Sequence, residues 1–455
     1  MNPSIFKTYD IRGVVPEELG VEAIKKIAAA LIKYLEPKSV VLGFDSRLSS
    51  PEFAAEAKEI FLDAGVDVFD LGMVPIEVVY FACGHLKVPG VMITASHNPR
   101  EYNGIKIIDS EVLPVSMGYG LEKIKNIALS ENGNMETQSK RGEIKKIDIW
   151  PDYLEKIFSF IDIKNIKPIK FVCDASNGVA GNVLTKITRG LPIKMTQINF
   201  VPDGDFPNHG PNPMLSKNRN QLIEECKKID DLSFAAIFDG DADRIALLDE
   251  NGDFVDTDYL SALISKILIT KNGANTVVFD MRRGWAVKNQ VESLGSKYLP
   301  SKSGYPFIRE KMQKVNAIFG GEASAHNIYR DFFFADSSMI TLLLIVEYLS
   351  ENNIKLSEAL EEYRESIFMF EETNFQVKDI DNVIRTLKNK FNDGKTNEED
   401  GLSVEYNEWH LNLRPSATQP LVRLNLEGTD PELIEEKRDQ VIKIIENNGG
   451  VIVDE

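Results

Sequence analysis

The sequence predicts three tandem related α/β domains with mixed, mainly parallel sheets, followed by a smaller C-terminal α+β domain, arranged around a central cleft. Strand-like apolar runs alternate with segments of helical length through most of the chain, which is the pattern of βαβ units. A chain of 455 residues is also too long for one hydrophobic core. Beyond about residue 370, short alternating strands replace the βαβ pattern, which predicts a different kind of last domain.

The first part of the chain follows the βαβ pattern closely. Residues 21–34 carry apolar side chains at helical spacing, and the apolar run after them closes at Asp45. The expected elements are a strand over 6–15 that is broken by a polar turn with Tyr9, Arg12 and Gly13, a helix over 21–34, a strand over 39–44, a helix over 51–64 and a strand over 65–72. This order predicts a mainly parallel sheet.

The strand that closes on an aspartate recurs twice more. Residues 40–45, 169–174 and 276–280 are each an apolar run that ends in Asp, followed by a small, polar or basic loop and a helix-like segment. Their spacing of roughly 130 and 105 residues is too long for a solenoid repeat. Three related domains in tandem are therefore expected, with chance similarity of the strand ends as the alternative.

Polar and turn-rich stretches near 130–146, 249–253 and 368–377 divide the chain. The predicted domains are 1–145, 146–252, 253–368 and 369–455. In the last of them, we expect strands over 402–406, 409–413 and 421–426, before a helix over 430–446.

Composition and charge exclude several classes of protein. A net charge of −18, from 52 Lys+Arg and 70 Asp+Glu, argues against bulk binding of nucleic acid or anionic membrane, although a local basic pocket can still hold an anion. Cys83, Cys173 and Cys226 are odd in number and lack metal-ligand spacing, which fits free thiols in a reducing compartment. The first residues contain no apolar core of signal-peptide length, and the longest apolar stretch, 339–349, is too short to span a bilayer. We therefore expect a cytoplasmic protein, either a monomer or a homodimer.

The stretch 91–107 carries the first candidate site. It starts as a buried strand and then breaks into small and polar residues, which places Ser96 on a loop at a strand end, with Thr94 and Asn98 beside it and Lys106 further on. Such a loop suits a nucleophile or a phosphate site. A Ser-His hydrolase pair is not expected, because neighbours in an extended chain point to opposite sides and His97 would then be badly placed to take the serine proton. A simple turn serine is the alternative.

The second candidate site is the run 235–244. An apolar strand leads directly into Asp239, Asp241 and Asp243, whose alternation in a tight, extended loop is expected to aim all three carboxylates to one side. Three close carboxylates repel one another unless a cation holds them, and oxygen ligands suit Mg²⁺ or Ca²⁺. An EF-hand calcium loop closing at Glu250 is the alternative, but Arg244 stands where its glycine belongs and a strand precedes it.

Two further loops carry groups that bind phosphate or sugar. In 414–423, Arg414 and Arg423 flank the hydroxyls of Ser416 and Thr418, a combination that suits a phosphate dianion; a solvated turn is the alternative. In 320–326, Glu322, Ser324 and His326 stand at alternate positions after a strand-like run and can reach sugar hydroxyls from one side. A structural role for His326 is the alternative in this second loop.

Together these motifs resemble the α-D-phosphohexomutase superfamily. The stretches 94–99, 239–244, 321–326 and 414–420 occur in its order and approximate spacing, and the opening Tyr-Asp-Ile-Arg-Gly at 9–13 is similar to its phosphomannomutase/phosphoglucomutase branch. The resemblance covers essentially the whole chain in four domains. It implies an isomerase of carbohydrate metabolism that interconverts hexose 1-phosphate and hexose 6-phosphate, of mannose or glucose, through a phosphoserine and a hexose 1,6-bisphosphate intermediate that also acts as activator.

The resemblance also assigns roles to residues. Ser96 would be the phosphoserine, and Mg²⁺ would be bound by its phosphate with Asp239, Asp241 and Asp243. Arg12 and Lys106 would flank the transferring phosphoryl group. The remaining catalytic candidates that the resemblance suggests are His97 and Arg244, and the substrate-binding candidates are Tyr9, Arg282, Gly304, Tyr305, Glu322, Ser324, His326, Arg414, Ser416, Thr418 and Arg423.

The sequence also departs from the pattern of the superfamily. In the sugar loop, residues 320–326, Ala325 replaces the usual glycine, which could stiffen the loop. In the phosphate loop, residues 414–423, Ala417 and Gln419 replace the usual asparagine and glutamate. These changes leave the preferred sugar open. A phosphoglucosamine mutase is the nearest alternative, although that branch usually opens differently from 9–13, and a catalytically idle phosphosugar-binding protein is the alternative outside enzymes.

Overall fold

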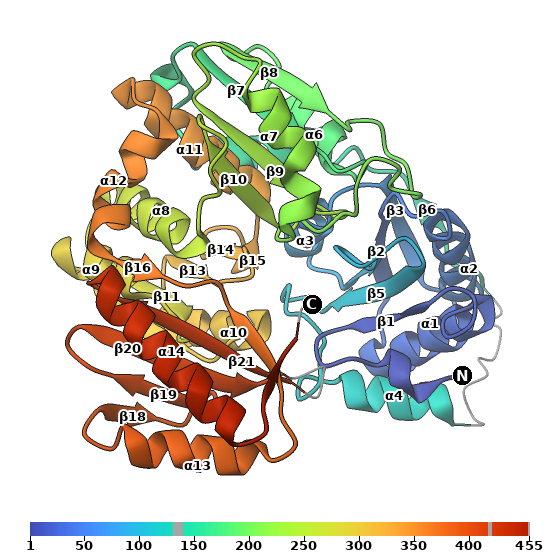
Figure 1. Cartoon of the computed structure of the whole chain (residues 1–455). Coiled ribbons are helices and arrows are strands. Elements are labelled where there is room, and N and C mark those ends of the chain that lie inside the picture. Colours follow the sequence, from blue (N-terminus) through green and yellow to red (C-terminus); the bar gives the residue numbers. More distant parts are fainter. Residues whose placement is uncertain (131–139, 417–420, 454–455) are drawn as a thin grey trace. The chain divides into compact units, whose positions relative to one another are not determined.

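The computed structural model describes residues 1–130, 140–416 and 421–453, and their strands form mixed sheets covered by helices (Figure 1). The chain divides into two compact units. Unit 1 comprises Met1–Val255 and His326–Leu356, and unit 2 comprises Asp256–Ala325 and Ser357–Glu455. The segment 326–356 therefore belongs to unit 1, although the predicted third domain, 253–368, includes it; the predicted boundaries stay a prediction.

The first sheet of unit 1 carries the serine loop, residues 94–101, between two of its strands. Its strands, in spatial order, are β1 (Ile11–Val14), β5 (Tyr102–Ile108), β4 (Gly90–Ile93), β2 (Ser39–Phe44), β3 (Asp67–Met73) and β6 (Ile144–Lys145). Strand β2 runs parallel to β3 and β4, whereas β5 is antiparallel to both β4 and β1. The associated helices are α1 (Val21–Leu35), α2 (Ser50–Asp63), α3 (Ile76–Leu86) and α4 (Leu121–Leu129).

Helices cover both faces of this sheet. Helices α1, α2 and α4 pack their apolar sides against alternate strand residues such as Val40 and Leu42. The neighbouring residue Gly43 instead meets Val79 of α3, which lies on the opposite face. Because successive side chains of a strand point to opposite faces, an apolar run without polar alternation is buried on both sides, as the sequence predicts.

The second sheet of unit 1 contains the aspartate loop. Its strands, in order, are β10 (Ile245–Asp249), β9 (Phe234–Phe238), β7 (Ile169–Asp174) and β8 (Ile193–Ile198). Strand β7 is parallel to β8 and β9, and β9 forms an antiparallel pair with β10. The other elements of this part of unit 1 are α5 (Trp150–Phe158), α6 (Ala180–Ile187), α7 (Asn220–Cys226), the antiparallel pair β14 (Asn327–Tyr329) and β15 (Ala335–Asp336), and α11 (Ser338–Asn352).

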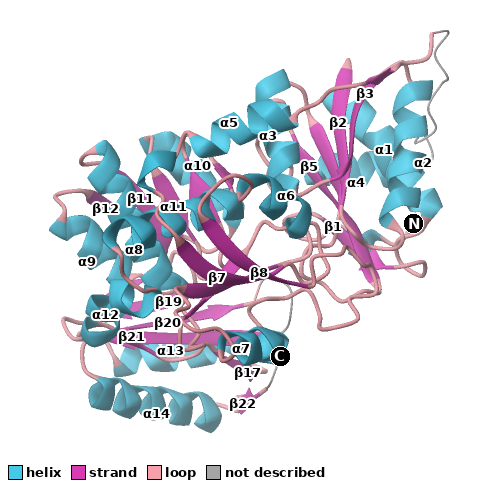
Figure 2. Cartoon of the chain, turned by 90° about the horizontal axis from the view of Figure 1, so that it is seen from above, coloured by secondary structure: helices cyan, strands magenta, loops and turns pink. Residues whose placement is uncertain are grey.

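Unit 2 begins with a third parallel arrangement. Strand β11 (Thr276–Asp280) lies between β12 (Lys297–Ser301) and β13 (Phe319–Gly321) and is parallel to both. The accompanying helices are α8 (Thr257–Asn272), α9 (Trp285–Ser293), α10 (Tyr305–Val315) and α12 (Leu356–Ser366), shown in cyan in Figure 2.

The recurring strand closed by aspartate marks a true structural repeat. Strands β2, β7 and β11 each stand at the centre of three parallel strands. The aspartate after or at each strand end, Asp45, Asp174 or Asp280, accepts a hydrogen bond from the backbone N–H two residues further on, at 3.1, 2.8 and 3.0 Å. The same turn thus follows the central strand three times, which chance similarity of strand ends does not explain.

The last sheet is antiparallel. Its strands are β18 (Lys395–Asn397), β19 (Leu402–Glu405), β20 (Trp409–Pro415), β21 (Leu421–Gly428), β17 (Thr373–Gln376) and β22 (Val451–Ile452) in order, with β16 (Phe368–Met369) also beside β21. Helices α13 (Ile380–Lys390) and α14 (Pro431–Asn447) share one apolar core with this sheet. The expected α+β domain is confirmed. Among the described residues, no helix is long and apolar enough to cross a membrane.

Glu77 is a buried carboxyl group in unit 1 that links three helices. It lies at the start of α3 and accepts hydrogen bonds from the hydroxyls of Tyr153 on α5 and of Ser337, the N-cap of α11, the latter at 2.6 Å. Burial raises the pKa of Glu77 to about 7, although these donors act in the opposite direction. Its proton therefore stays bound in the folded protein at pH values where the unfolded chain has released it.

We expect this carboxyl to make the stability of the protein depend on pH. A pKa of about 7 when folded against an ordinary 4.5 stabilises the folded state by about 3 kcal/mol below pH 4.5, and this contribution disappears as the pH rises through 7. The variant Glu77→Gln should lack this slope. Chemical denaturation of both proteins between pH 5 and 8, as an experimental range, measures the difference; parallel curves would contradict the assignment.

Candidate active site

Ser96 lies at the carboxyl end of β4, on the loop that leads to β5. Its side chain is buried, with 1% of the residue exposed, and the backbone of Ser96 adopts the left-handed conformation with φ of 52°. Its hydroxyl donates to Asp239 Oδ2 at 2.6 Å, and its backbone N–H donates to Thr94 Oγ1 at 2.8 Å. The serine therefore points at the first aspartate of the second sheet, which is what the candidate serine and metal motifs need if they act together.

The expectation that His97 points away from Ser96 is wrong. His97 Nδ1 lies 3.2 Å from Ser96 Oγ. The alternation of side chains holds only for an extended chain, and the positive φ of Ser96 turns the backbone so that the two neighbours face each other. Burial and the neighbouring cations Arg244 and Arg12 lower the pKa of His97 well below its ordinary value, so the imidazole is neutral.

Arg12 lies on β1 and is tied to the serine loop. Its guanidinium contacts both carboxylate oxygens of Asp10, with Nη2 to Oδ2 at 2.8 Å. The same side chain donates to the carbonyl oxygen of Ala95 at 3.0 Å and to the side chain of Asn98. Tyr9, in the turn before β1, is 37% exposed. Arg12 is thus held against the residues on either side of Ser96, with Asp10 as its carboxylate partner.

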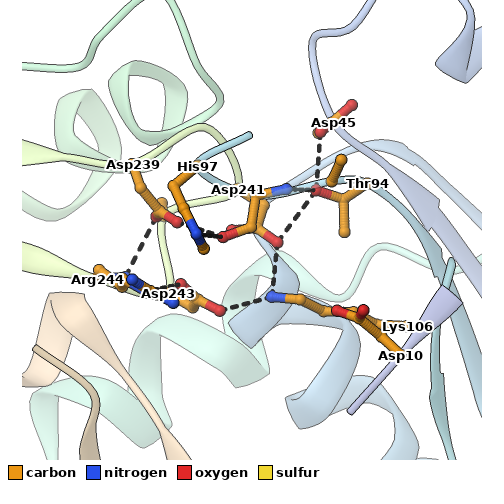
Figure 3. Close-up of polar contacts among 12 residues, drawn as sticks. Asp10, Asp45, Thr94, His97, Lys106, Asp239, Asp241, Asp243 and Arg244 are labelled. Carbon is orange, nitrogen blue, oxygen red and sulfur yellow. Dashed lines mark hydrogen bonds and ion pairs between the residues drawn. The ribbon is translucent and has the colours of Figure 1, made fainter. Parts of the chain in front are cut away.

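The three aspartates converge in the turn between β9 and β10 (Figure 3). Asp239, Asp241 and Asp243 are buried, and each offers one carboxylate oxygen within 4.8 Å of the others. The convergence was predicted from an extended loop, but the backbone turns instead: Ala242 is left-handed with φ of 59°, and its N–H donates to the Asp239 carbonyl at 3.2 Å. Arg244 donates its backbone N–H to Asp239 Oδ1 at 3.2 Å.

Lys106, on β5, partly neutralises this cluster. Its ammonium donates to Asp241 Oδ2 at 2.8 Å and to Asp243 Oδ2 at 2.5 Å (Figure 3). Burial opposes the charge of Lys106, but the attraction of these two carboxylates raises its pKa. Lys106 therefore contacts two of the candidate metal ligands, Asp241 and Asp243.

The carboxylates do not share their charge equally. Burial and the two neighbouring aspartates raise the pKa of Asp239 well above its usual range. Burial also acts on Asp243, but Lys106, His326 and Arg244 lower the pKa of Asp243 well below that range. One member of the trio thus favours a bound proton, because three adjacent buried carboxylates cannot all remain ionised without additional positive charge.

The donor set fits a hard divalent cation. Asp241 Oδ1 and Asp243 Oδ1 are buried and have no hydrogen-bond partner among the described residues. Unpaired buried carboxylate oxygens are costly unless a cation binds them, and oxygen ligands are those that Mg²⁺ and Ca²⁺ prefer. The cluster is therefore an acidic site that can bind a metal ion.

The EF-hand alternative does not agree with the fold. Residues 245–249, which would form the second half of the calcium loop, are strand β10, paired in antiparallel register with β9. Glu250 follows that strand and so stands at the far end of it from the aspartates. A strand cannot fold back to bring Glu250 to Asp239 in a twelve-residue loop of the kind an EF-hand requires.

His326 joins this half of the site. Its Nδ1 lies 2.7 Å from Asp336 Oδ2 on β15, and both residues lie close enough to Asp243 to offer atoms within 4.8 Å of one another. The sequence groups His326 with Glu322 and Ser324, its neighbours in the chain. The structure adds the link to the aspartate loop, which only the folding of 326–336 back onto unit 1 creates.

The predicted substrate-binding residues are divided between the units: Tyr9 and His326 belong to unit 1, and the others belong to unit 2. Glu322 is buried, and the Ser324 hydroxyl is buried without a hydrogen-bond partner among the described residues. Arg282 follows β11 and pairs with Asp280, with its Nε at 2.7 Å from Oδ2, while its Nη2 lies 3.6 Å from Glu322 Oε1. Gly304, with φ of 118°, precedes α10, whose first residue Tyr305 accepts a hydrogen bond from Arg309 at 3.1 Å.

Ala325 occupies a backbone conformation that suits glycine. Its φ is 72°, in the left-handed region, where a side chain costs roughly 1 kcal/mol or more. This explains why glycine is favourable at this position of the loop, and it makes Ala325 a strained residue between Ser324 and His326.

The phosphate loop is described in part. Arg414 stands on β20 and Arg423 on β21, where they are register partners across the two strands. The backbone N–H of Ser416 donates to the Leu421 carbonyl at 2.8 Å. Thr418 lies outside the described residues. The structure therefore places the two arginines opposite each other on neighbouring strands.

Comparison with known proteins accounts for this order of motifs. Four models of the phosphoglucomutase/phosphomannomutase family match consecutive parts of the chain. They are alpha/beta/alpha domain I over residues 3–133, domain II over 151–252, domain III over 256–366 and the C-terminal domain over 371–444. The chain belongs to the phosphoglucomutase/phosphomannomutase family.

Similar members of this family are known at full length. The "phosphohexose mutases" protein of Xanthomonas campestris pv. campestris strain B100 is 36% identical over 442 residues, which cover 96% of this chain and 98% of the relative. The phosphomannomutase of Escherichia coli strain K12 is 35% identical over 454 residues, covering 97% and 98%. A crystal structure of a family protein from Burkholderia thailandensis has a TM-score of 0.88, 28% identity and 99% coverage of both chains.

Three groups of residues that contact the candidate site residues within each unit escape prediction from motifs. Glu372 accepts from Arg423 at 3.1 Å and lies 3.5 Å from Arg282, so it joins two predicted arginines, yet it lies in a stretch expected to be a domain boundary. Asp10 and Asp336 each hold a predicted residue. Arg47 contacts the serine loop, and its signal was present: it follows one of the three aspartate-closed strands.

Proposed function

We propose that this protein is a phosphohexomutase that interconverts hexose 1-phosphate and hexose 6-phosphate, of mannose or glucose, through a phosphorylated Ser96. The hydrogen bond from Ser96 Oγ to Asp239, at the edge of an acidic cluster, is the observation that supports it best. Simple binding of a phosphosugar needs neither a buried serine nor an acidic metal site beside it. The family match and relatives known as phosphomannomutases support the reaction class.

The proposed reaction moves one phosphoryl group in each direction. A hydroxyl of the sugar phosphate attacks phosphorus, the bond from phosphorus to Ser96 Oγ breaks, and a hexose 1,6-bisphosphate forms. Ser96 Oγ then attacks the phosphorus of the other phosphate, the bond from that phosphorus to the sugar oxygen breaks, and the serine proton passes to the sugar oxygen. The isomeric monophosphate leaves and the phosphoserine is restored. The proton released by the attacking hydroxyl is balanced by the proton taken up at Ser96 Oγ, and the neutral His97 imidazole at 3.2 Å can hand it over.

The positive groups beside Ser96 would stabilise the phosphoryl group during transfer. Arg12 and Lys106 are fixed by Asp10 and by the aspartate cluster, so they need no reorganisation when charge develops on the transferring oxygens. Asp239, Asp241 and Asp243 would hold Mg²⁺, which when bound supplies positive charge to the phosphate oxygens. The buried Oδ1 atoms of Asp241 and Asp243, which have no hydrogen-bond partner among the described residues, and the raised pKa of Asp239 support a cation at this place.

The residues of unit 2 would recognise the sugar and its other phosphate. Arginine presents a planar fork of N–H donors that suits a phosphate dianion, and Arg414 with Arg423 provides two such forks on adjacent strands. The buried hydroxyl of Ser324 and the carboxylate of Glu322 are suited to the hydroxyls of a sugar. The proposed mechanism requires these groups and Ser96 to act on one substrate.

A coupled assay tests the proposed function. Purified protein with Mg²⁺ and a catalytic trace of hexose 1,6-bisphosphate should convert glucose 1-phosphate and mannose 1-phosphate to their 6-phosphates. Glucosamine 1-phosphate serves as the third substrate, and its dominant turnover would move the protein to the amino-sugar branch. If none of the three substrates is converted while calorimetry still shows phosphosugar binding, the protein is instead a catalytically idle phosphosugar-binding protein.

A further inference from the structure

We propose that Arg47 is a positioning residue, whose buried guanidinium holds the loop that carries Ser96 in the conformation required for phosphoryl transfer. This inference rests on the proposed function, because it concerns how the nucleophile of that reaction is held. Arg47 stands three residues beyond β2, is 1% exposed and has no place among the predicted site residues.

The guanidinium gathers four carbonyl oxygens of one loop. Arg47 Nη2 donates to Ser96 O at 2.8 Å and to Asn98 O at 2.6 Å. Arg47 Nη1 donates to Pro99 O at 2.7 Å and to Tyr102 O at 2.8 Å. These four residues lie along the chain from the end of β4 to the start of β5, so one side chain fixes both ends of the serine loop.

Arg47 is itself locked from two sides. Its Nε and its backbone N–H each lie 3.1 Å from an oxygen of Asp45, which balances the buried charge. The ring of Phe206, from the loop before α7, lies 5.3 Å from the guanidinium carbon and covers it. Gly204 allows this loop to approach, because a Cβ there would lie 2.4 Å from the backbone nitrogen of Leu48. The guanidinium is therefore charged, desolvated and fixed.

The loop needs such support because its key residue is strained. A serine with φ of 52° occupies a region that costs about 1–3 kcal/mol and persists only where the surroundings enforce it. That same φ brings Ser96 Oγ to Asp239 and to His97. The hydrogen bond from Arg47 to Ser96 O therefore acts on the very peptide group that sets the direction of the nucleophile.

The structural repeat shows that this use of an arginine is specific to the first sheet. Arg282 stands at the equivalent position after β11 and repeats the two contacts with the preceding aspartate, through its backbone N–H and its Nε. Its Nη2 also donates to Asp280 Oδ2 at 2.5 Å, and its Nη atoms lie 3.6 and 3.5 Å from the carboxylates of Glu322 and Glu372. The Nη atoms of Arg47 face backbone carbonyls instead. The same turn thus presents one arginine toward side chains of the predicted sugar site and the other toward the serine loop.

Only an arginine can make this set of contacts. Its five N–H donors have a fixed planar arrangement, and Arg47 uses all of them: one Nε–H donates to Asp45 and four Nη–H donate to carbonyls. A lysine has three donors on a single nitrogen and can keep the charge, but it cannot reach both ends of the loop. We call the four contacts of the Arg47 guanidinium with backbone carbonyls the clamp. The variant Arg47→Lys should remove the clamp and retain the ion pair with Asp45.

Arg219→Lys is the matched control in the same unit. Arg219 is 9% exposed, donates to the carbonyls of Pro213 and Met214 at 2.9 and 2.8 Å, and lies 4.1 Å from the ring of Phe254. It repeats the design of a buried arginine under a phenylalanine, but it holds a loop without a predicted site residue. Both substitutions should lower the melting temperature of the protein, but only Arg47→Lys should strongly lower kcat.

We expect Arg47→Lys to lower kcat by about 100-fold, the effect of a displacement near 1 Å at a reacting group, with KM changed by less than about threefold. Arg219→Lys should keep kcat within about threefold of the wild type. Equal kcat values for the two variants, or a loss confined to KM, would overturn the proposal. If Arg47→Lys does not fold, Phe206→Leu replaces it, with Phe254→Leu as control; Phe206→Leu must then be the slower enzyme, and equal rates would overturn the proposal.

Hydrogen exchange separates this proposal from the proposed function. Backbone amides of 96–102 should exchange faster in Arg47→Lys than in the wild type, and at the wild-type rate in Arg219→Lys. This measurement needs no activity, so a wild type without mutase turnover would refute the function and leave the clamp to be judged by exchange. Unchanged exchange in Arg47→Lys would refute the clamp, whatever the activity.

Discussion

Ser96→Ala should abolish mutase turnover, with a fall in kcat on the order of 10⁴-fold or more, the scale of losing a covalent nucleophile. The substitution removes the oxygen that carries the phosphoryl group between the two half-reactions. The fold should remain, because the change removes only the contacts of one hydroxyl, with Asp239 and with His97, and a hydrogen bond contributes about 1 kcal/mol. The coupled assay measures the rate, and intact-mass spectrometry should detect a phosphorylated form in the wild type alone after incubation with bisphosphate.

Ser116→Ala provides the control for this substitution. Ser116 is a buried serine of the same unit, 1% exposed, and its hydroxyl has no hydrogen-bond partner among the described residues. This variant should retain turnover and phosphorylation. Binding of glucose 1-phosphate by calorimetry should survive in Ser96→Ala, because the groups that bind the sugar are intact. Turnover of Ser96→Ala within about tenfold of the wild type would exclude the phosphoserine mechanism.

The strands and helices of this fold can be predicted from the sequence because local patterns determine them. Strands β2, β7 and β11 begin and end at the residues that their apolar runs and closing aspartates predict. An apolar run must be buried, and an aspartate that accepts the backbone N–H two residues on ends it with a turn. Neither requires knowledge of distant residues, so both can be predicted from one stretch of chain.

The chemical groups were predictable, but their orientation was not. The three aspartates were expected to converge, and they do, although through a turn with a left-handed Ala242. His97 was expected to face away from Ser96, and it faces it. A positive φ at a non-glycine residue depends on contacts from elsewhere in the fold, here Arg47 and Thr94, and no local pattern announces it.

The residues that hold the site were the least predictable. A charged residue after a strand is ordinarily expected at the surface, yet Arg47 is buried because carbonyls 49 to 55 positions away use all its Nη donors. Glu372 lies about 90 residues from Arg282 and about 50 from Arg423, its two partners. Pairing of this kind is set by topology, which a single sequence reveals only through the family that it resembles.

Asp241→Asn should weaken binding of the divalent cation on the order of 100-fold and raise the Mg²⁺ concentration needed for half-maximal activity in parallel. The substitution preserves shape and removes one of three negative charges. Asp241 Oδ1 is buried without a hydrogen-bond partner among the described residues, whereas Oδ2 accepts from Lys106 and Thr94. The lost charge therefore comes from the cluster that a cation would balance. Titration with Mn²⁺, followed by electron paramagnetic resonance, measures binding without reference to turnover.

Glu250→Gln is the control that separates this site from a calcium loop. An EF-hand would use Glu250 as its last ligand, and losing that charge would weaken Mn²⁺ and Ca²⁺ binding as strongly as Asp241→Asn does. In the observed fold β10 separates Glu250 from the aspartates, so Glu250→Gln should bind Mn²⁺ like the wild type. Removal of metal with a chelator should stop wild-type turnover, and added Mg²⁺ should restore it. Turnover that persists in the chelator, or Mn²⁺ affinity unchanged in Asp241→Asn, would show that the aspartates do not hold the metal.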